Sequence, residues 1–195
     1  MNILKPRVRA ALVTTAAAGA SIASLLGMGG IAHASTVASP HTAGFVTIDS
    51  CTGVAGQINY SPGLRKYATL NQQAVLTGTT SGCADAFSGP LSGTGTFTAV
   101  LSGKAKLGAE NFTGSFTINW PAGSGFNPST GSLSVTESNG LETISGTVTG
   151  GFDTGCALSM QYVTTGNTGK GTARSPITAQ TYVNTQSLAL ARNEG

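Results

Sequence analysis

The sequence predicts an all-β fold: an Ig-like antiparallel β-sandwich of about nine strands, with a closed β-barrel as the alternative. Polar and apolar residues alternate along many short segments, as they do in strands that bury one face. Charged residues make up 9% of the chain, whereas Gly, Thr and Ser are abundant, which is typical of sheets with polar, uncharged outer faces. Turn-forming residues separate the alternating segments at the short spacing of sandwiches and barrels.

The segment 112–120 is the clearest expected strand. Phe112, Phe116 and Trp120 fall on one face of it, and Thr and Ser residues fall on the other. Asn139-Gly140 lies between two alternating runs, 131–137 and 141–149. Because both residues accept positive φ, we expect an antiparallel hairpin there. The remaining expected strands are 54–60, 96–101 and 158–163, with weaker candidates at 45–49, 68–77 and 177–183.

The first 34 residues have the features of a secretory signal peptide. Three basic residues precede an uncharged apolar run, 10–31, and Ala32-His33-Ala34 forms a cleavage motif. We therefore expect cleavage between Ala34 and Ser35 and a secreted, extracellular product with no membrane span after signal removal. A retained membrane anchor is the alternative, because the apolar run is long enough to span a bilayer.

The mature chain, 195 − 34 = 161 residues, is long enough for one domain with a real core. We expect a flexible segment at 35–44, a single β-domain at 45–186 and a flexible tail at 187–195. The mature chain has 10 − 3 = 7 basic and 7 acidic residues, so its net charge is about zero. Arg65-Lys66 and Lys104/Lys106 are the only local basic clusters, which is too few for a nucleic-acid partner.

Phe152-Asp153-Thr154-Gly155 has the apolar-Asp-Thr-Gly pattern that opens the catalytic loop of an aspartic protease. That chemistry needs two carboxylates sharing a proton, and this chain carries the tripeptide once. Asp and Gly are turn formers, so we expect an ordinary turn. Glu137 and Glu142 flank the predicted hairpin and could meet near its mouth, which would suggest glycoside hydrolysis or a Ca²⁺ site. The interpretation we favour is two solvated carboxylates.

Other catalytic and metal chemistry lacks the residues it needs. The mature chain has one His, His41, close to its N-terminus, and no Gly-x-Ser-x-Gly motif, so a nucleophilic Ser or Cys lacks a convincing base. The acidic residues are scattered rather than clustered at metal-ligand spacing. We therefore expect no catalytic residues, no cofactor and no metal site.

Aromatic side chains are the candidates for stacking on a glycan. Trp120, Tyr60 and Tyr162 are in phase with apolar residues and are expected in the core. Tyr67 and Tyr182 are the expected exposed, ligand-stacking residues.

The mature chain has three cysteines, Cys51, Cys83 and Cys156, so one is left over or pairs between chains. Cys156 shares the phase of Leu158 and Met160, so we expect it to face the core.

Several motifs resemble those of a group of small secreted Gly/Thr-rich β-proteins of actinobacteria. Cys51-Thr52-Gly53 is followed by the stretch GQINYSPGL, 56–64, then by Gly82-Cys83, and later by a single Trp in FTINW, 116–120. The resemblance covers roughly residues 47–169. It implies a secreted β-sandwich and brings no catalytic residues. From this resemblance we expect a Cys51–Cys83 disulfide, with Cys156 left as a free thiol.

The sequence thus predicts a secreted, non-enzymatic extracellular or cell-envelope protein with a binding or structural role. Its partner is unknown; a cell-wall glycan or another extracellular protein are the candidates. Three alternatives stay open: a glycan-binding module, a hydrolase that uses Asp153 or the Glu137/Glu142 pair, and a small-ligand carrier.

Overall fold

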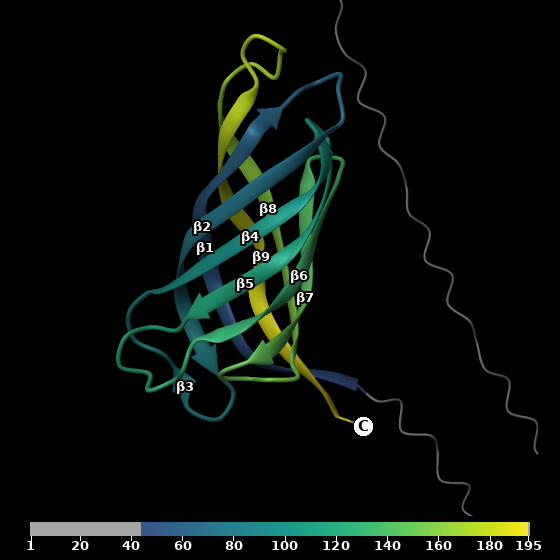
Figure 1. Ribbon diagram of the computed structural model, residues 1–195. Coiled ribbons are helices and arrows are strands. Elements are labelled where there is room, and N and C mark those ends of the chain that lie inside the picture. Colours follow the sequence, from purple (N-terminus) through teal and green to yellow (C-terminus); the bar gives the residue numbers. More distant parts are fainter. Residues whose placement is uncertain (1–43, 195) are drawn as a thin grey trace, which may run out of the picture. The chain divides into compact units, whose positions relative to one another are not determined.

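The computed structural model describes residues 44–194, which form nine strands and no helix (Figure 1). The strands are β1 (Gly44–Leu64), β2 (Leu70–Asp85), β3 (Gly89–Pro90), β4 (Gly95–Lys106), β5 (Ala109–Asn119), β6 (Ser129–Ser138), β7 (Leu141–Gly150), β8 (Ala157–Thr168) and β9 (Ile177–Glu194). The expected signal peptide, its cleavage site at Ala34/Ser35 and most of the segment 35–44 lie outside the described residues.

The strands form one continuous antiparallel sheet that closes on itself. The strand order is β1-β9-β8-β7-β6-β5-β4-β2-β3, and β1 also pairs with β2, from Asp49↔Asp85 to Ser61↔Gln73. Eight strands therefore make a barrel, to which the two-residue β3 adds at the end of β2. The expected all-β fold of about nine strands is confirmed.

The closed barrel, which the sequence left as the alternative, is observed in place of the Ig-like sandwich. The 21-residue β1 explains the closure, because it pairs with β9 on one side and with β2 on the other. A sandwich needs two sheets with free edges, and this double pairing leaves none at β1. Alternation within single strands is the same in both architectures, so it did not distinguish them.

The core fills the inside of the barrel. Phe97, Phe112 and Tyr162 are among its largest fully buried side chains. Glycine makes room for such side chains where they would otherwise collide. A Cβ atom on Gly131 would collide with the carbonyl oxygen of Thr147 and lie 2.8 Å from Cε1 of Phe116, so only glycine fits there.

The β6–β7 hairpin forms as predicted. Ser138 pairs with Leu141, and the two residues between them, Asn139 and Gly140, have φ values of 56° and 77°. Positive φ at both central residues is the geometry of a two-residue hairpin turn.

Strand β9 contradicts the expected flexible tail at 187–195. It runs to Glu194 and pairs with both β1 and β8; Leu190, for example, lies opposite Asp49 and Leu158. Leu188 and Leu190 are fully buried, so two apolar anchors hold this part of the strand in the core. The domain therefore extends past residue 186.

The barrel has two distinct ends (Figure 1). The hairpin end carries the connections 65–69, 107–108, 139–140 and 169–176. The terminal end carries the start of β1, the end of β9 and the β7–β8 connection, 151–156. These two names are kept below.

Candidate functional site

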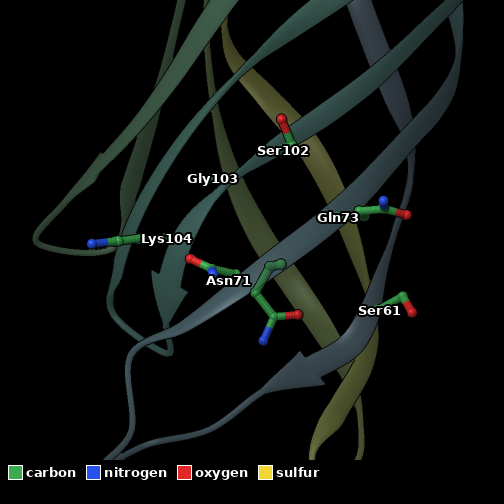
Figure 2. Close-up of a pocket in the computed structure, with 7 residues that line it drawn as sticks. Ser61, Asn71, Gln73, Ser102, Gly103 and Lys104 are labelled. Carbon is green, nitrogen blue, oxygen red and sulfur yellow. The ribbon is translucent and has the colours of Figure 1, made fainter.

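A hollow of about 640 Å³ lies on the outside of the barrel where β1, β2 and β4 run side by side (Figure 2). We call it the outer hollow. It is lined by Ser61, Asn71, Gln72, Gln73, Ser102, Gly103 and Lys104. Apart from Lys104 and Gly103, these residues carry neutral hydroxyl and amide side chains, which both donate and accept hydrogen bonds.

Alternation and register bring these residues together. Ser61, Gln73 and Ser102 are exposed positions on three adjacent strands, and Gln73 lies opposite both of the others. Asn71 and Lys104 are likewise opposite each other, two residues further along β2 and β4. Because neighbouring strands lie about 4.8 Å apart, these pairs present polar groups at short, regular intervals across the sheet.

Gln72 anchors the wall of the outer hollow from the inside. Its side chain is buried; its Oε1 accepts a hydrogen bond from the Gly63 amide at 3.0 Å, and its Nε2 donates to the Gly63 carbonyl at 2.8 Å. This pair of bonds ties the end of β1 to β2. The hollow is therefore built on fixed backbone, which lowers the entropy lost when a ligand binds.

A second hollow of about 500 Å³ extends the same polar surface over β5, β6 and β7. Ser102 lies opposite Thr113, Thr113 opposite Ser134, and Ser134 opposite Ser145. The Oγ atoms of Ser134 and Ser145 are 3.0 Å apart and share a hydrogen bond. We call the six aligned residues the polar row: Ser61, Gln73, Ser102, Thr113, Ser134 and Ser145.

Only one of the two tyrosines expected to stack on a ligand is exposed. Tyr67, on the β1–β2 connection, is 89% exposed, and the Nζ of Lys66 lies 5.4 Å from its ring centroid. The expectation of an exposed Tyr182 is wrong. Tyr182 points into the barrel and packs against Tyr162, with ring centroids 5.0 Å apart. Its position on β9 is in phase with the buried Gln180, a polar residue that masked the inward face in the sequence.

Trp120, Tyr60 and Tyr162 are buried, as predicted.

Two buried glutamates lie inside the barrel near the hairpin end. The Tyr60 hydroxyl lies 3.1 Å from Oε2 of Glu110 and 2.7 Å from Oε1 of Gln180. Burial raises the pKa of Glu110 to about 7, although the hydrogen bond with Tyr60 opposes the rise. Burial, together with the charges of Glu110 and Glu137, raises the pKa of Glu142 to about 8. Both carboxyls therefore hold protons over part of the neutral range.

The favoured interpretation of Glu137 and Glu142 as two solvated carboxylates is wrong for Glu142. The two are direct register partners, so they do meet beside the hairpin. Glu142, however, is buried, and its Oε2 has no hydrogen-bond partner. Glu137 is half-buried: its Oε1 accepts a bond from the Gly140 amide at 2.9 Å, and its Oε2 has no partner. The strand period turns Glu142 inward with Ile144, and a sequence cannot show that the inside of a barrel is where that face points.

Asp153 occupies the expected turn at the terminal end, but its side chain is buried. Its φ of 62° is held by tight backbone bonds, including Cys156 N to Asp153 O at 3.0 Å. Phe152 fixes the turn from the other side: its ring stacks on Phe126 at 3.9 Å, and its carbonyl accepts from Ser129 Oγ at 2.6 Å. The Asp-Thr-Gly tripeptide thus forms part of a sharp turn in the β7–β8 connection, which these contacts hold in place.

Asp153 has an acidic partner that sequence reasoning missed. The carboxyl of Asp49 interacts with its charge, and Asp85 is the register partner of Asp49 on β2. Burial, together with the neighbouring carboxyls of Asp153 and Asp85, raises the pKa of Asp49 to about 8. The signal was present in the sequence, since Ile48-Asp49-Ser50 repeats the apolar-Asp-hydroxyl order of Phe152-Asp153-Thr154.

The Asp49–Asp153 pair brings two carboxyls together, as a catalytic dyad does, but neither is accessible to a substrate. Asp49 is 1% exposed and Asp153 is 9% exposed. Neither lines the outer hollow or the second hollow. A general acid or base must come within hydrogen-bond reach of its substrate, and side chains this deeply buried do not.

The predicted disulfide is confirmed. Cys51 and Cys83 are register partners on β1 and β2, and their sulfurs are bonded. Cys156 carries a free, buried thiol immediately before β8, and burial raises its pKa. A buried, protonated thiol is a poor nucleophile, so Cys156 acts as a small core residue.

Within residues 44–194, no group of three or more His, Cys, Asp or Glu side chains is arranged to hold a metal ion. The same part of the chain contains no helix with the length and apolar character needed to cross a bilayer.

Comparison with known proteins returned no match to a protein-family model, to a curated protein or to a solved structure. The functional argument therefore depends on the chain's own geometry. The residues of the outer hollow were not singled out in the sequence, because Ser, Asn and Gln at outward positions stand out only after the strands are paired.

Proposed function

We propose that this protein is a secreted, non-enzymatic extracellular protein that binds a polysaccharide through the outer hollow and the polar row. One observation carries the proposal: neutral hydroxyl and amide side chains line a hollow of about 640 Å³ and continue in register over the neighbouring strands. Sugars present many hydroxyl groups, and such groups are matched best by side chains that both donate and accept.

Secretion is supported by the signal-like N-terminus and by the Cys51–Cys83 disulfide. Disulfides form and persist in oxidising compartments, which include the cell exterior. A polysaccharide of the cell wall is the kind of partner that a protein released there encounters.

The two enzymatic hypotheses receive less support than polysaccharide binding. Asp49, Asp153, Glu110 and Glu142 are all buried, and the outer hollow contains no carboxylate. The small-ligand carrier also receives less support, because large side chains such as Phe97 and Tyr162 fill the interior of the barrel.

The test is titration of the protein with a soluble neutral polysaccharide, hydroxyethylcellulose, and with fully methyl-esterified polygalacturonate, by calorimetry or affinity electrophoresis. The variant Gln73→Ala/Ser102→Ala removes two adjacent polar groups of the outer hollow. We expect it to bind at least tenfold more weakly than the wild type. The matched control, Gln186→Ala/Ser92→Ala, removes the same two side-chain types from exposed positions outside the hollow and the polar row and should bind normally.

Equal binding by the two double variants would place the binding surface elsewhere. Lack of binding by the wild type to either polymer would count against the proposed ligand class.

A further inference from the structure

Most of the cationic side chains lie at one end of the barrel, although they are spread over more than a hundred residues of the sequence. The described residues contain seven Lys and Arg, of which six lie at or beside the hairpin end: Arg65, Lys66, Lys104, Lys106, Lys170 and Arg174. The seventh, Arg192, lies near the terminal end. In the sequence these six appeared as two unrelated pairs and two isolated residues.

Three connections that carry or adjoin these cations are joined by backbone hydrogen bonds. The amide of Lys66 donates to the Gly171 carbonyl at 2.7 Å, which joins the β1–β2 and β8–β9 connections. The amide of Leu107 donates to the Arg65 carbonyl at 3.0 Å, which joins the β4–β5 and β1–β2 connections. Gly171, with a φ of 70°, sits at the junction, where an added Cβ would lie 3.3 Å from the Leu107 side chain. The cations are therefore held on one rim.

These cations are not neutralised by the protein. Lys66, Lys104, Lys170 and Arg174 are exposed. No side-chain hydrogen bond or ion pair links any of the six to another described residue, and the Nε of Arg65 is buried without an acceptor. A group of like charges that stays uncompensated raises the local concentration of anions and speeds their association.

Of the three acids at the same end, only Glu137 lies beside the rim, with its Oε2 near Gly108 of the β4–β5 connection. Glu110 and Glu142 lie inside the barrel, where burial favours their neutral forms. Glu137 is half-buried, and its Oε1 already accepts from the Gly140 amide. The rim therefore keeps a positive surface even though the mature chain is close to neutral overall.

The rim adjoins the outer hollow. Lys104 belongs to both, and Asn71, opposite it, begins the hollow one residue inside β2 (Figure 2). A ligand that fills the hollow thus reaches the cations without a gap. This continuity favours a ligand that combines hydroxyl groups with negative charges in one chain.

We infer that the ligand is an acidic polysaccharide, whose hydroxyl groups bind in the outer hollow and whose carboxylate or phosphate groups bind at the cationic rim. The inference rests on the proposed function. It favours an acidic polysaccharide over two other classes of negatively charged partner, a membrane surface and a single-stranded nucleic acid. Tyr67 is the one large aromatic or aliphatic side chain among the described residues of this end that is strongly exposed. A membrane surface would call for several inserted apolar side chains, and a single-stranded nucleic acid for a series of stacking aromatics.

The test compares polygalacturonate with its fully methyl-esterified form, which has the same backbone without the charges. We expect the wild type to bind polygalacturonate about tenfold more tightly in low salt, and to lose that advantage as NaCl is raised, since each neutralised charge releases a counterion. Lys66→Gln/Lys170→Gln/Arg174→Gln should remove the advantage and leave binding of the esterified polymer unchanged. Arg192→Gln, matched to Arg174→Gln as a single change, should have no effect on either polymer.

The outcomes distinguish failure of the acidic-ligand inference from failure of the proposed glycan site. Equal affinity for both polymers, with Gln73→Ala/Ser102→Ala still defective, would overturn the acidic class and leave the outer hollow as a glycan site. Failure to bind either polymer would defeat both. Tighter binding to phosphatidylglycerol vesicles or to single-stranded DNA than to polygalacturonate would also overturn the assignment.

Discussion

The buried carboxyl of Glu142 should make this barrel more stable in acid than in base. The pKa of Glu142 is raised from its ordinary value of 4.5 to about 8, chiefly by burial. The folded protein therefore holds this proton more tightly than the unfolded chain does. Stability from this group is fully present below pH 4.5 and is lost as the pH rises toward and through 8.

The size of the effect follows from the two pKa values. Each unit of difference corresponds to about 1.4 kcal/mol. Between pH 5 and pH 8 this group is mostly ionised in the unfolded chain, whereas the folded protein largely keeps the proton. Over that interval the group lowers the free energy of unfolding by roughly 3 to 4 kcal/mol. This is a large fraction of the ~5–15 kcal/mol by which a domain is usually stable.

The perturbation is Glu142→Gln, which keeps the shape of the side chain and removes its titration. The assay is urea unfolding at pH 5 and pH 8 at constant ionic strength, followed by the fluorescence of Trp120, the single Trp, which is buried at the opposite end. We expect the drop in unfolding free energy between the two pH values to shrink by roughly 3 kcal/mol in the variant. Glu137→Gln, at the partner position, should change it much less because Glu137 is half-buried.

An identical pH dependence in the wild type and in Glu142→Gln would refute this reasoning. So would a wild-type protein that is more stable at pH 8 than at pH 5.

The other predictions concern the disulfide, the packed interior and the Asp49–Asp153 pair. Cys83→Ala should lower the melting temperature strongly, because the disulfide closes a loop of 32 residues, which is worth ~3–4 kcal/mol in the chain-entropy model. Cys156→Ala should lower it much less, and equal shifts in the two variants would contradict this expectation. Gly131→Ala should cost about 1–3 kcal/mol in chemical unfolding, because its methyl group would press on the Thr147 carbonyl and the Phe116 ring, and an unchanged midpoint would contradict this close packing. Asp49→Asn should raise stability at pH 9, where the buried carboxyl of Asp49 is ionised in the wild type, and should leave polysaccharide binding intact; a loss of binding would tie the pair to function.

The sequence predicted what depends on neighbours along the chain. The β6–β7 hairpin followed from Asn139-Gly140, and the faces of β5 followed from the alternation around Phe112 and Phe116. Closure of the barrel depends on β1 pairing with both β2 and β9, a long-range choice that single-strand alternation does not encode.

The candidate site was hidden for the same reason. Ser61, Gln73 and Ser102 form a hollow only because three strands bring them into register. The cationic rim likewise needs Lys66 and Lys170 on touching connections, although they lie about a hundred residues apart in the sequence. Tyr182 shows the reverse error, since a residue expected outside fills the interior.

Mapping by NMR shows directly whether the outer hollow binds a polysaccharide. The backbone amide signals of uniformly ¹⁵N-labelled protein would be followed while oligogalacturonate is added. The account predicts that the largest shifts fall on the lining of the hollow, at Gln73, Ser102 and Lys104, and on the adjoining connections. Shifts confined to the terminal end around Asp153, or no shifts at saturating ligand, would contradict it.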